Sequence, residues 1–223
     1  MKVARRGWIG LLLLAVTLLA GCAPTQTVLR YEVETKQPVV WPPAPEIPRY
    51  RYVGELTGEE NIRAEGGSGL GDTAVKALKW LVGLFSERPE AVILQRPQAG
   101  AAGEDGRIYV TDVSRQAVYV FDEKAGKLLV WDKALEHARF EAPIGIAPGA
   151  NGEVLVADAS LGLVTRLNRD GIPVGSFGKE VLKHPTGLAR DPARGRIYVA
   201  DAHAHQIKVF DDTGALVDTF GKG

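Results

Sequence analysis

The pattern of apolar and polar positions changes twice along the chain. Residues 8–20 form one apolar run, WIGLLLLAVTLLA. Residues 72–85 place apolar side chains at helical spacing, which predicts an amphipathic helix with Asp72 as its N-cap. From residue 96 onward, short apolar stretches alternate with turns rich in Asp, Asn and Gly, which is typical of an all-β domain.

The apolar stretches after residue 96 belong to an internal repeat, because segments 96–132, 142–178 and 184–221 align. The second residue of each segment is a proline, and the prolines are 46 and 42 residues apart. Each second apolar stretch ends with an aspartate, and the aspartates are 46 and 43 residues apart. Two independent markers therefore give one period. They are Pro97, Pro143 and Pro185, and Asp112, Asp158 and Asp201.

Each repeat is expected to form four short strands. In the third repeat these are GLA, RIYV, QIKVF and LVDTF, separated by turns such as DDTG. The middle strands are almost continuously apolar, which indicates sheets covered on both faces. A four-stranded unit of this length that stacks on its like is typical of a β-propeller blade. We therefore predict a partial β-propeller of three units over residues 92–223.

The third repeat, HPTGLARDPARGRIYVADAHAHQIKVFDDTGALVDTFG, resembles the NHL repeat in its Pro-x-Gly, Tyr-Val-Ala-Asp and Val-Phe-Asp strands. His205 and Gln206 stand where that repeat has His and Arg, whereas Ala204 replaces the usual Asn. The phrase VVWPPAPEIPRYRYVGEL also looks like the opening of bacterial exported NHL proteins. NHL propellers usually have six blades, so the resemblance implies a fragment of a longer propeller, or a half-ring that a second chain completes.

The apolar run of residues 8–20 is too short to span a membrane, which takes about 20 apolar residues. The basic residues Lys2, Arg5 and Arg6 precede it, and small residues follow it. This order is typical of a secretory signal peptide, which we place at residues 1–21.

The residues that follow the apolar run, Leu19-Ala20-Gly21-Cys22, resemble a bacterial lipobox. The resemblance implies cleavage between Gly21 and Cys22, a lipid on Cys22, and further acylation with a fatty acid such as palmitate. Two or three acyl chains hold a protein on a membrane without a spanning helix. Ala23 after the cysteine, rather than Asp, favours the outer membrane over the inner membrane. Cys22 is the only cysteine, so an intrachain disulfide is excluded.

Residues 22–48 hold six prolines and are expected to form an extended, lipid-anchored tether. The alternative is that the VVWPPAP stretch packs along the domain surface. Residues 49–91 are predicted to contain a strand over 49–58, a glycine-rich loop and the amphipathic helix. The strand lies where a ring-closing strand would sit.

Charge and composition exclude some classes of partner. Removing residues 1–21 takes away three basic residues and no acidic one, which leaves 24 basic against 27 acidic residues. Without a basic patch there is no sign of nucleic-acid binding. We expect a non-enzymatic scaffold, with no cofactor, that binds a protein or glycan of the cell envelope.

Two sets of polar residues are candidate sites. Asp112, Asp158 and Asp201 recur once per repeat, so we expect them to cap the turn after the second strand rather than to react. His203 and His205 are candidate metal ligands, but zinc needs three or four ligands, so we predict no metal site. The resemblance to peptidyl-hydroxyglycine lyases, which are zinc-dependent NHL-type propellers, makes a metal-dependent lyase or lactonase the alternative function.

Overall fold

The three aligned repeats fold as three four-stranded antiparallel sheets, which confirms the predicted all-β fold. The computed structural model describes residues 26–32, 38–65 and 92–221. Within each sheet the strands follow chain order, and we call the sheets the first, second and third blade. Their strands are β5 (Pro97–Ala102), β6 (Arg107–Asp112), β7 (Ala117–Asp122) and β8 (Lys127–Trp131); β11 (Pro143–Pro148), β12 (Val154–Asp158), β13 (Leu163–Leu167) and β14 (Pro173–Phe177); and β15 (Pro185–Asp191), β16 (Arg196–Asp201), β17 (Gln206–Asp211) and β18 (Leu216–Phe220).

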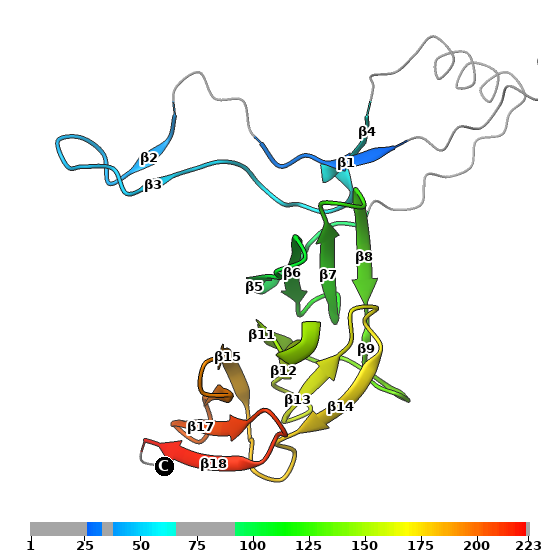
Figure 1. Cartoon of the computed structure of the whole chain (residues 1–223), viewed down its shortest axis with the longest axis vertical. Coiled ribbons are helices and arrows are strands. Elements are labelled where there is room, and N and C mark those ends of the chain that lie inside the picture. Colours follow the sequence, from blue (N-terminus) through cyan, green and yellow to red (C-terminus); the bar gives the residue numbers. More distant parts are fainter. Residues whose placement is uncertain (1–25, 33–37, 66–91, 222–223) are drawn as a thin grey trace, which may run out of the picture.

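The blades follow one another along an arc, with their first strands on its inner side (Figure 1). The first strand of the second blade, β11, contacts both β5 and β15, so the three first strands lie next to one another. The fourth strands β8, β14 and β18 lie on the outer side of the arc. This arrangement is a sector of a β-propeller, in which each blade stacks face to face on the next.

Apolar side chains fill the two seams between the blades, because alternate residues of each strand point to opposite faces. The continuous apolar pattern of the middle strands therefore supplies a core on both sides of the second blade. The first seam contains Val118, Val120, Trp131, Val154, Val156 and Leu167, and the second contains Leu155, Val164, Phe177, Ile197, Val199 and Phe210.

Two glycines allow the blades to approach closely at the outer side. Gly171 lies in the turn before β14, and a Cβ atom there would come within 2.4 Å of the indole of Trp131. Gly214 lies in the turn before β18, and a Cβ atom there would come within 2.7 Å of Phe177. Both glycines have positive φ, 76° and 91°. The aromatic residue that ends one blade therefore rests on the glycine turn of the next.

The first blade is covered on its other face by N-terminal elements rather than by a blade. Strand β1 (Thr27–Leu29) pairs with β4 (Ile62–Ala64), and the backbone of Thr27 lies against the turn glycine Gly126. Apolar residues from this layer pack on the buried strand β7. They are Leu29, Tyr31, Leu56, Ile62 and Leu94, set against Ala117, Tyr119 and Phe121.

A short hairpin lies between β1 and β4, where the sequence predicted a tether followed by one longer strand. Strand β2 (Val40–Trp41) pairs with β3 (Tyr50–Arg51), and their side chains are largely exposed. The segment predicted as a strand over 49–58 changes partner along its length. Tyr52 bonds to Val39 across the hairpin, whereas Gly54 bridges to Glu32 beside β1. The extended conformation was predicted, but its two partners were not.

A second hairpin separates the first and second blades. Strand β9 (Lys133–Leu135) pairs with β10 (Ala138–Arg139), and Ala134 within β9 and Phe140 directly after β10 are buried in the first seam. This insertion explains why the first two repeats are spaced further apart than the last two. The only helical segments among the described residues are the 3₁₀ turns η1 (Glu59–Asn61) and η2 (Ala150–Gly152).

Several predictions concern residues outside the described part of the chain. These are the signal peptide at 1–21, the lipidation site Cys22 and the amphipathic helix at 72–85. Within residues 26–32, 38–65 and 92–221, no helix has the length and apolar character needed to cross a membrane.

Candidate functional site

Each blade has two ends, which we name by their main feature. The aspartate end carries the turn between the second and third strands, together with the segment that enters the blade. The cavity end carries the turns between the first and second strands and between the third and fourth strands. The recurring aspartates and the candidate histidines lie at the aspartate end, whereas the hollow described below lies at the cavity end.

Asp158 shows what the recurring aspartates do at the aspartate end. Its buried carboxylate accepts hydrogen bonds from the backbone N–H groups of Glu141 (2.8 Å) and Ala142 (3.0 Å), which enter the blade. It also accepts from Ser160 (3.1 Å) and Leu161 (3.0 Å), which lie in the turn after β12. One carboxylate therefore joins the entering segment to the turn.

Asp112 and Asp201 make the same kind of contact in the other blades. Asp112 accepts from the backbone of Gln95, Arg96 and Arg115. In each blade the aspartate also lies opposite the repeat's proline, in the pairs Pro97–Asp112, Pro143–Asp158 and Pro185–Asp201. Since proline has no N–H to donate to the strand ladder, the aspartate binds the two residues before it instead.

The ionised form of Asp201 is favoured in the folded chain. Burial acts to raise the pKa of Asp201, but hydrogen bonds from the backbone of Lys183, His184 and Ala204 outweigh it, and the pKa lies below its ordinary value. A carboxylate that accepts several backbone N–H groups behaves in this way. Its role is therefore to hold the blade together.

The candidate histidines do not converge on one point. The rings of His184 and His203 are stacked, with centroids 4.1 Å apart and an interplanar angle of 14°. Parallel rings direct their nitrogen lone pairs side by side rather than towards one ion. His205 occupies the turn position with positive φ (53°), which Gln116 and Gly162 occupy in the other blades. Across the described residues, no three His, Cys, Asp or Glu side chains are grouped in a way that could hold a metal ion.

The cavity end contains a hollow of about 810 Å³. Its walls are formed where the first strand passes into the second in all three blades, at residues 102–105, at residues 148–153, and at Arg190 and Pro192. Tyr109, Val154 and Arg169 complete the lining. A cavity of this size lies within the range of ligand pockets, about 300–1,000 Å³.

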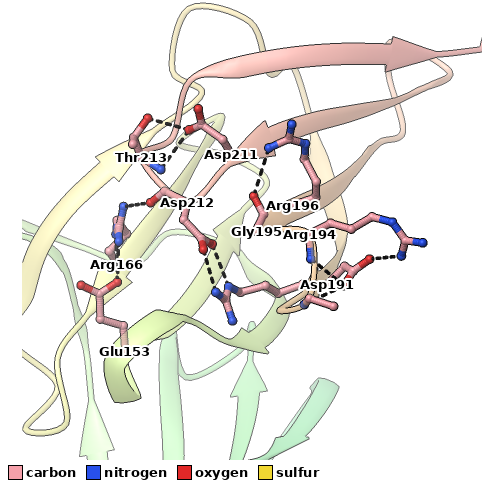
Figure 2. Close-up of polar contacts among 11 residues, drawn as sticks. Glu153, Arg166, Asp191, Arg194, Gly195, Arg196, Asp211, Asp212 and Thr213 are labelled. Atoms are coloured by element: carbon pink, nitrogen blue, oxygen red, sulfur yellow. Dashed lines mark hydrogen bonds and ion pairs between the residues drawn. The ribbon is translucent and has the colours of Figure 1, made fainter.

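A network of charged residues forms the part of the wall where the second blade meets the third (Figure 2). Arg166 is bound to Glu153 through both Nε (3.0 Å) and Nη2 (2.7 Å). Its Nη1 donates to the backbone oxygen of Asp212 in the third blade (2.7 Å). The carboxylate of Asp212 binds Arg190 in a two-bond contact of 2.8 and 2.7 Å.

The ion pair between Arg190 and Asp212 shifts the titration of both groups. The hydrogen bond from Arg190 lowers the pKa of Asp212, and the same bond raises the pKa of Arg190. Both groups therefore stay charged over the physiological range, and their charges cancel within the wall.

The same contact recurs between the first and second blades, from a different position in the repeat. Arg107 pairs with Asp122 (2.8 Å) and donates through Nη1 to the backbone oxygen of Arg169. The accepting oxygens belong to Arg169 and Asp212, which are equivalent because each lies eleven positions after the aspartate of its own blade. The donors are not equivalent. Arg107 lies before Asp112, the aspartate of the first blade, whereas Arg166 lies after Asp158, the aspartate of the second blade. A repeat alignment therefore could not identify this contact.

Two charges of the cavity have no opposite charge within ion-pairing distance among the described residues. They are Arg169 and Glu104, both exposed, whereas Asp105, Glu153 and Arg190 are paired with opposite charges. The cavity thus offers one positive and one negative group to a ligand. No local sequence pattern marks this site, because its residues come from turns of three different blades.

Comparison with known proteins identifies the repeat. The model of the NHL repeat matches residues 182–210, which cover the strands β15 and β16 and most of β17. The chain carries an NHL repeat. The human NHL repeat-containing protein 3 is 27% identical over 191 residues, which cover 78% of this chain and 52% of that protein. The mouse NHL-repeat-containing protein 4 is 36% identical over 77 residues, covering 34% of this chain and 55% of that protein.

These alignments span about half the length of those two relatives. Among solved structures, the chain is similar to a streptogramin B lyase, with a TM-score of 0.49 and 12% identity over 61% of this chain and 46% of the lyase. This likeness does not bear on the chemistry of the NHL-repeat chain.

Proposed function

We propose that this protein is a lipid-anchored scaffold of the bacterial cell envelope that binds a partner protein at its cavity end and catalyses no reaction. The observation that carries the proposal is the hollow between the turns of three blades, with Arg169 and Glu104 exposed in its lining. No side-chain arrangement in the described residues favours the metal-dependent lyase or lactonase that was the alternative.

The partner that suits this cavity is an extended polypeptide segment. A polypeptide supplies both signs of charge, so a carboxylate can meet Arg169 while a basic side chain meets Glu104. The apolar and backbone surfaces of Pro148, Gly149 and Ala150 between them can take uncharged residues of the same segment. Ligand sites of this kind combine apolar walls with a few placed polar groups.

The proposed lipid on Cys22 would hold the blades close to the membrane. Strand β1 begins at Thr27, only five residues after Cys22, and it packs on the first blade. Five extended residues span at most about 18 Å. A tether between this lipid and the domain would therefore be much shorter than the proline-rich segment 22–48, whose later part belongs to the β2–β3 hairpin.

The anchor is tested by feeding bacteria that express the full chain an alkyne analogue of palmitate. We expect labelled protein in the outer-membrane fraction and none for Cys22→Ser. Labelling of Cys22→Ser, or unlabelled wild-type protein with residues 1–21 still attached, would show that the lipobox interpretation is wrong.

The binding role is tested with a displayed library of random peptides, selected on the immobilised full-length protein. Selected peptides should carry both an acidic and a basic residue, and Arg169→Glu or Glu104→Lys should weaken their binding at least tenfold. Lys133→Glu and Glu136→Lys, on the β9–β10 hairpin, are the matched charge controls and should bind normally. Selection of oligosaccharides from a glycan array instead of peptides would overturn the choice of a protein partner.

A further inference from the structure

The side chain of Arg169 in the cavity lies directly against a glycine of the same blade. The glycine is Gly152, in the turn between β11 and β12, where it has a positive φ of 78°. A Cβ atom on Gly152 would come within 2.7 Å of Nη2 and 2.9 Å of Cζ of Arg169, and closer still to Nε. Cβ atoms essentially never lie this close to a neighbouring heavy atom. Any side chain at position 152 would therefore push the guanidinium of Arg169 out of its place.

The same distances show which edge of the guanidinium Gly152 meets. Nε and Nη2 are both nearer to the Cβ position than Cζ is, although Cζ lies between them in the guanidinium, so Gly152 lies beside the edge that these two nitrogens form. The edge formed by Nη1 and Nη2 points away from Gly152. A carboxylate that binds this second edge makes two parallel hydrogen bonds, which is the geometry in which arginine holds a carboxylate best.

The backbone of Arg169 is held by the first blade. Nη1 of Arg107 donates to the backbone oxygen of Arg169, and Nε of Arg107 is bound to Asp122 (2.8 Å). The side chain of Asn168 closes the turn that carries Arg169, because it accepts from the backbone N–H of Ile172 (2.9 Å). The point from which the Arg169 side chain starts is therefore fixed both within its own turn and from the neighbouring blade.

The turn that carries Gly152 is held in a similar way. The next residue, Glu153, is bound through its carboxylate to Arg166 (2.7 and 3.0 Å; Figure 2). Arg166 in turn donates to the backbone oxygen of Asp212 in the third blade (2.7 Å). The two arginines that cross the seams between blades therefore each fix one side of the contact between Arg169 and Gly152.

We propose that Gly152 and Arg107 are positioning residues that hold the guanidinium of Arg169 at one point of the cavity, where it selects a carboxylate side chain of the bound polypeptide. The inference rests on the proposed function for the identity of the ligand, but not for the geometry of Arg169. A cation that is fixed before binding loses little side-chain freedom when the ligand arrives. The cavity therefore distinguishes an acidic residue from an uncharged one at that place in the polypeptide.

The first test follows the Nε–H signal of Arg169 by NMR in the isotope-labelled full-length protein without ligand, with Arg169→Lys to assign the signal. We expect the heteronuclear NOE of a rigid N–H group in the wild type and of a mobile one in Gly152→Ala and Arg107→Met. Gly106→Ala is the matched control and should leave the signal rigid. Gly106 also has a positive φ (85°), but a Cβ atom there would meet only Lys124, at 3.5 Å or more. An Arg169 signal that is as mobile in the wild type as in Gly152→Ala overturns the proposal.

The second test measures by calorimetry the affinity of a peptide selected on the wild-type protein, and of the same peptide with its acidic residue replaced by the corresponding amide. Arg169→Ala and Gly152→Ala should each weaken the acidic peptide about tenfold, because each removes the contact of one bound carboxylate. The double variant should bind no more weakly than either single variant, and Gly152→Ala should bind the amide peptide as the wild type does.

Two other results would have different meanings. Losses that add in the double variant, or a Gly152→Ala protein that also loses the amide peptide, would show that Gly152 serves the fold and not Arg169, which overturns the positioning role. If no peptide binds the wild type, the proposed function is wrong, and the rigid or mobile signal of Arg169 still decides whether Gly152 and Arg107 position it.

Discussion

Replacing Asp158 with asparagine tests whether one carboxylate holds the second blade together. The buried carboxylate accepts backbone hydrogen bonds from Glu141, Ala142, Ser160 and Leu161. In asparagine one oxygen becomes an NH₂ group, which cannot accept, so about two of these donors lose their partner. Hydrogen bonds to a charged group contribute about 1.5–3 kcal/mol each, so we expect a loss of about 3–5 kcal/mol in the free energy of unfolding.

The assay is urea unfolding of the full-length protein, followed by the circular dichroism of its strands and extrapolated linearly to zero urea. Asp170→Asn is the matched control, because Asp170 is exposed in the turn before β14 and should change stability by less than about 0.5 kcal/mol. A loss below about 1 kcal/mol for Asp158→Asn would refute the reasoning that the carboxylate joins the two segments.

Four further predictions follow from the same structure. Gly171→Ala should cost about 3 kcal/mol, because the new Cβ atom meets the indole of Trp131 at a positive φ; urea unfolding measures it. Phe177→Ala should cost about 3–5 kcal/mol by opening a cavity in the second seam, measured in the same way. Folding lowers the pKa of Asp201, so its ionised form stabilises the chain above about pH 4. Stability should therefore fall as the pH drops through the folded-state pKa. Thermal unfolding between pH 6 and pH 3 measures this decline, which Asp201→Asn should flatten. Arg166→Met should cost about 1–2 kcal/mol, and the loss should shrink at 0.5 M salt because the ion pair is partly exposed.

The blades could be predicted from the sequence because their signals are local. Each strand is a short apolar run, each turn contains residues that favour turns, and the repeat of Pro97, Pro143 and Pro185 with the three aspartates marks the period. The structure shows why the prolines and the aspartates recur together, since each proline lies opposite the aspartate of its blade in the strand ladder. Residues that meet within one blade are close in sequence, so pattern and spacing are sufficient to place them.

The contacts between blades could not be predicted in the same way. Arg107 and Arg166 reach equivalent backbone oxygens from positions that are not equivalent, so the repeat alignment does not match them. Likewise, His203 stacks on His184, which precedes it by nineteen residues, rather than grouping with its neighbour His205. Contacts of this kind depend on the angle and distance between sheets, which no local pattern records.

The sequence by itself determined the number of repeats, their strands and the residues that close each blade, because hydrogen bonding and turn formation act over a few residues. Only the tertiary structure decided which faces are covered. It placed β1 over the first blade and gathered turns of three blades around the cavity of Arg169. Each of these outcomes depends on how separately folded units pack against one another, which is a property of the three-dimensional structure.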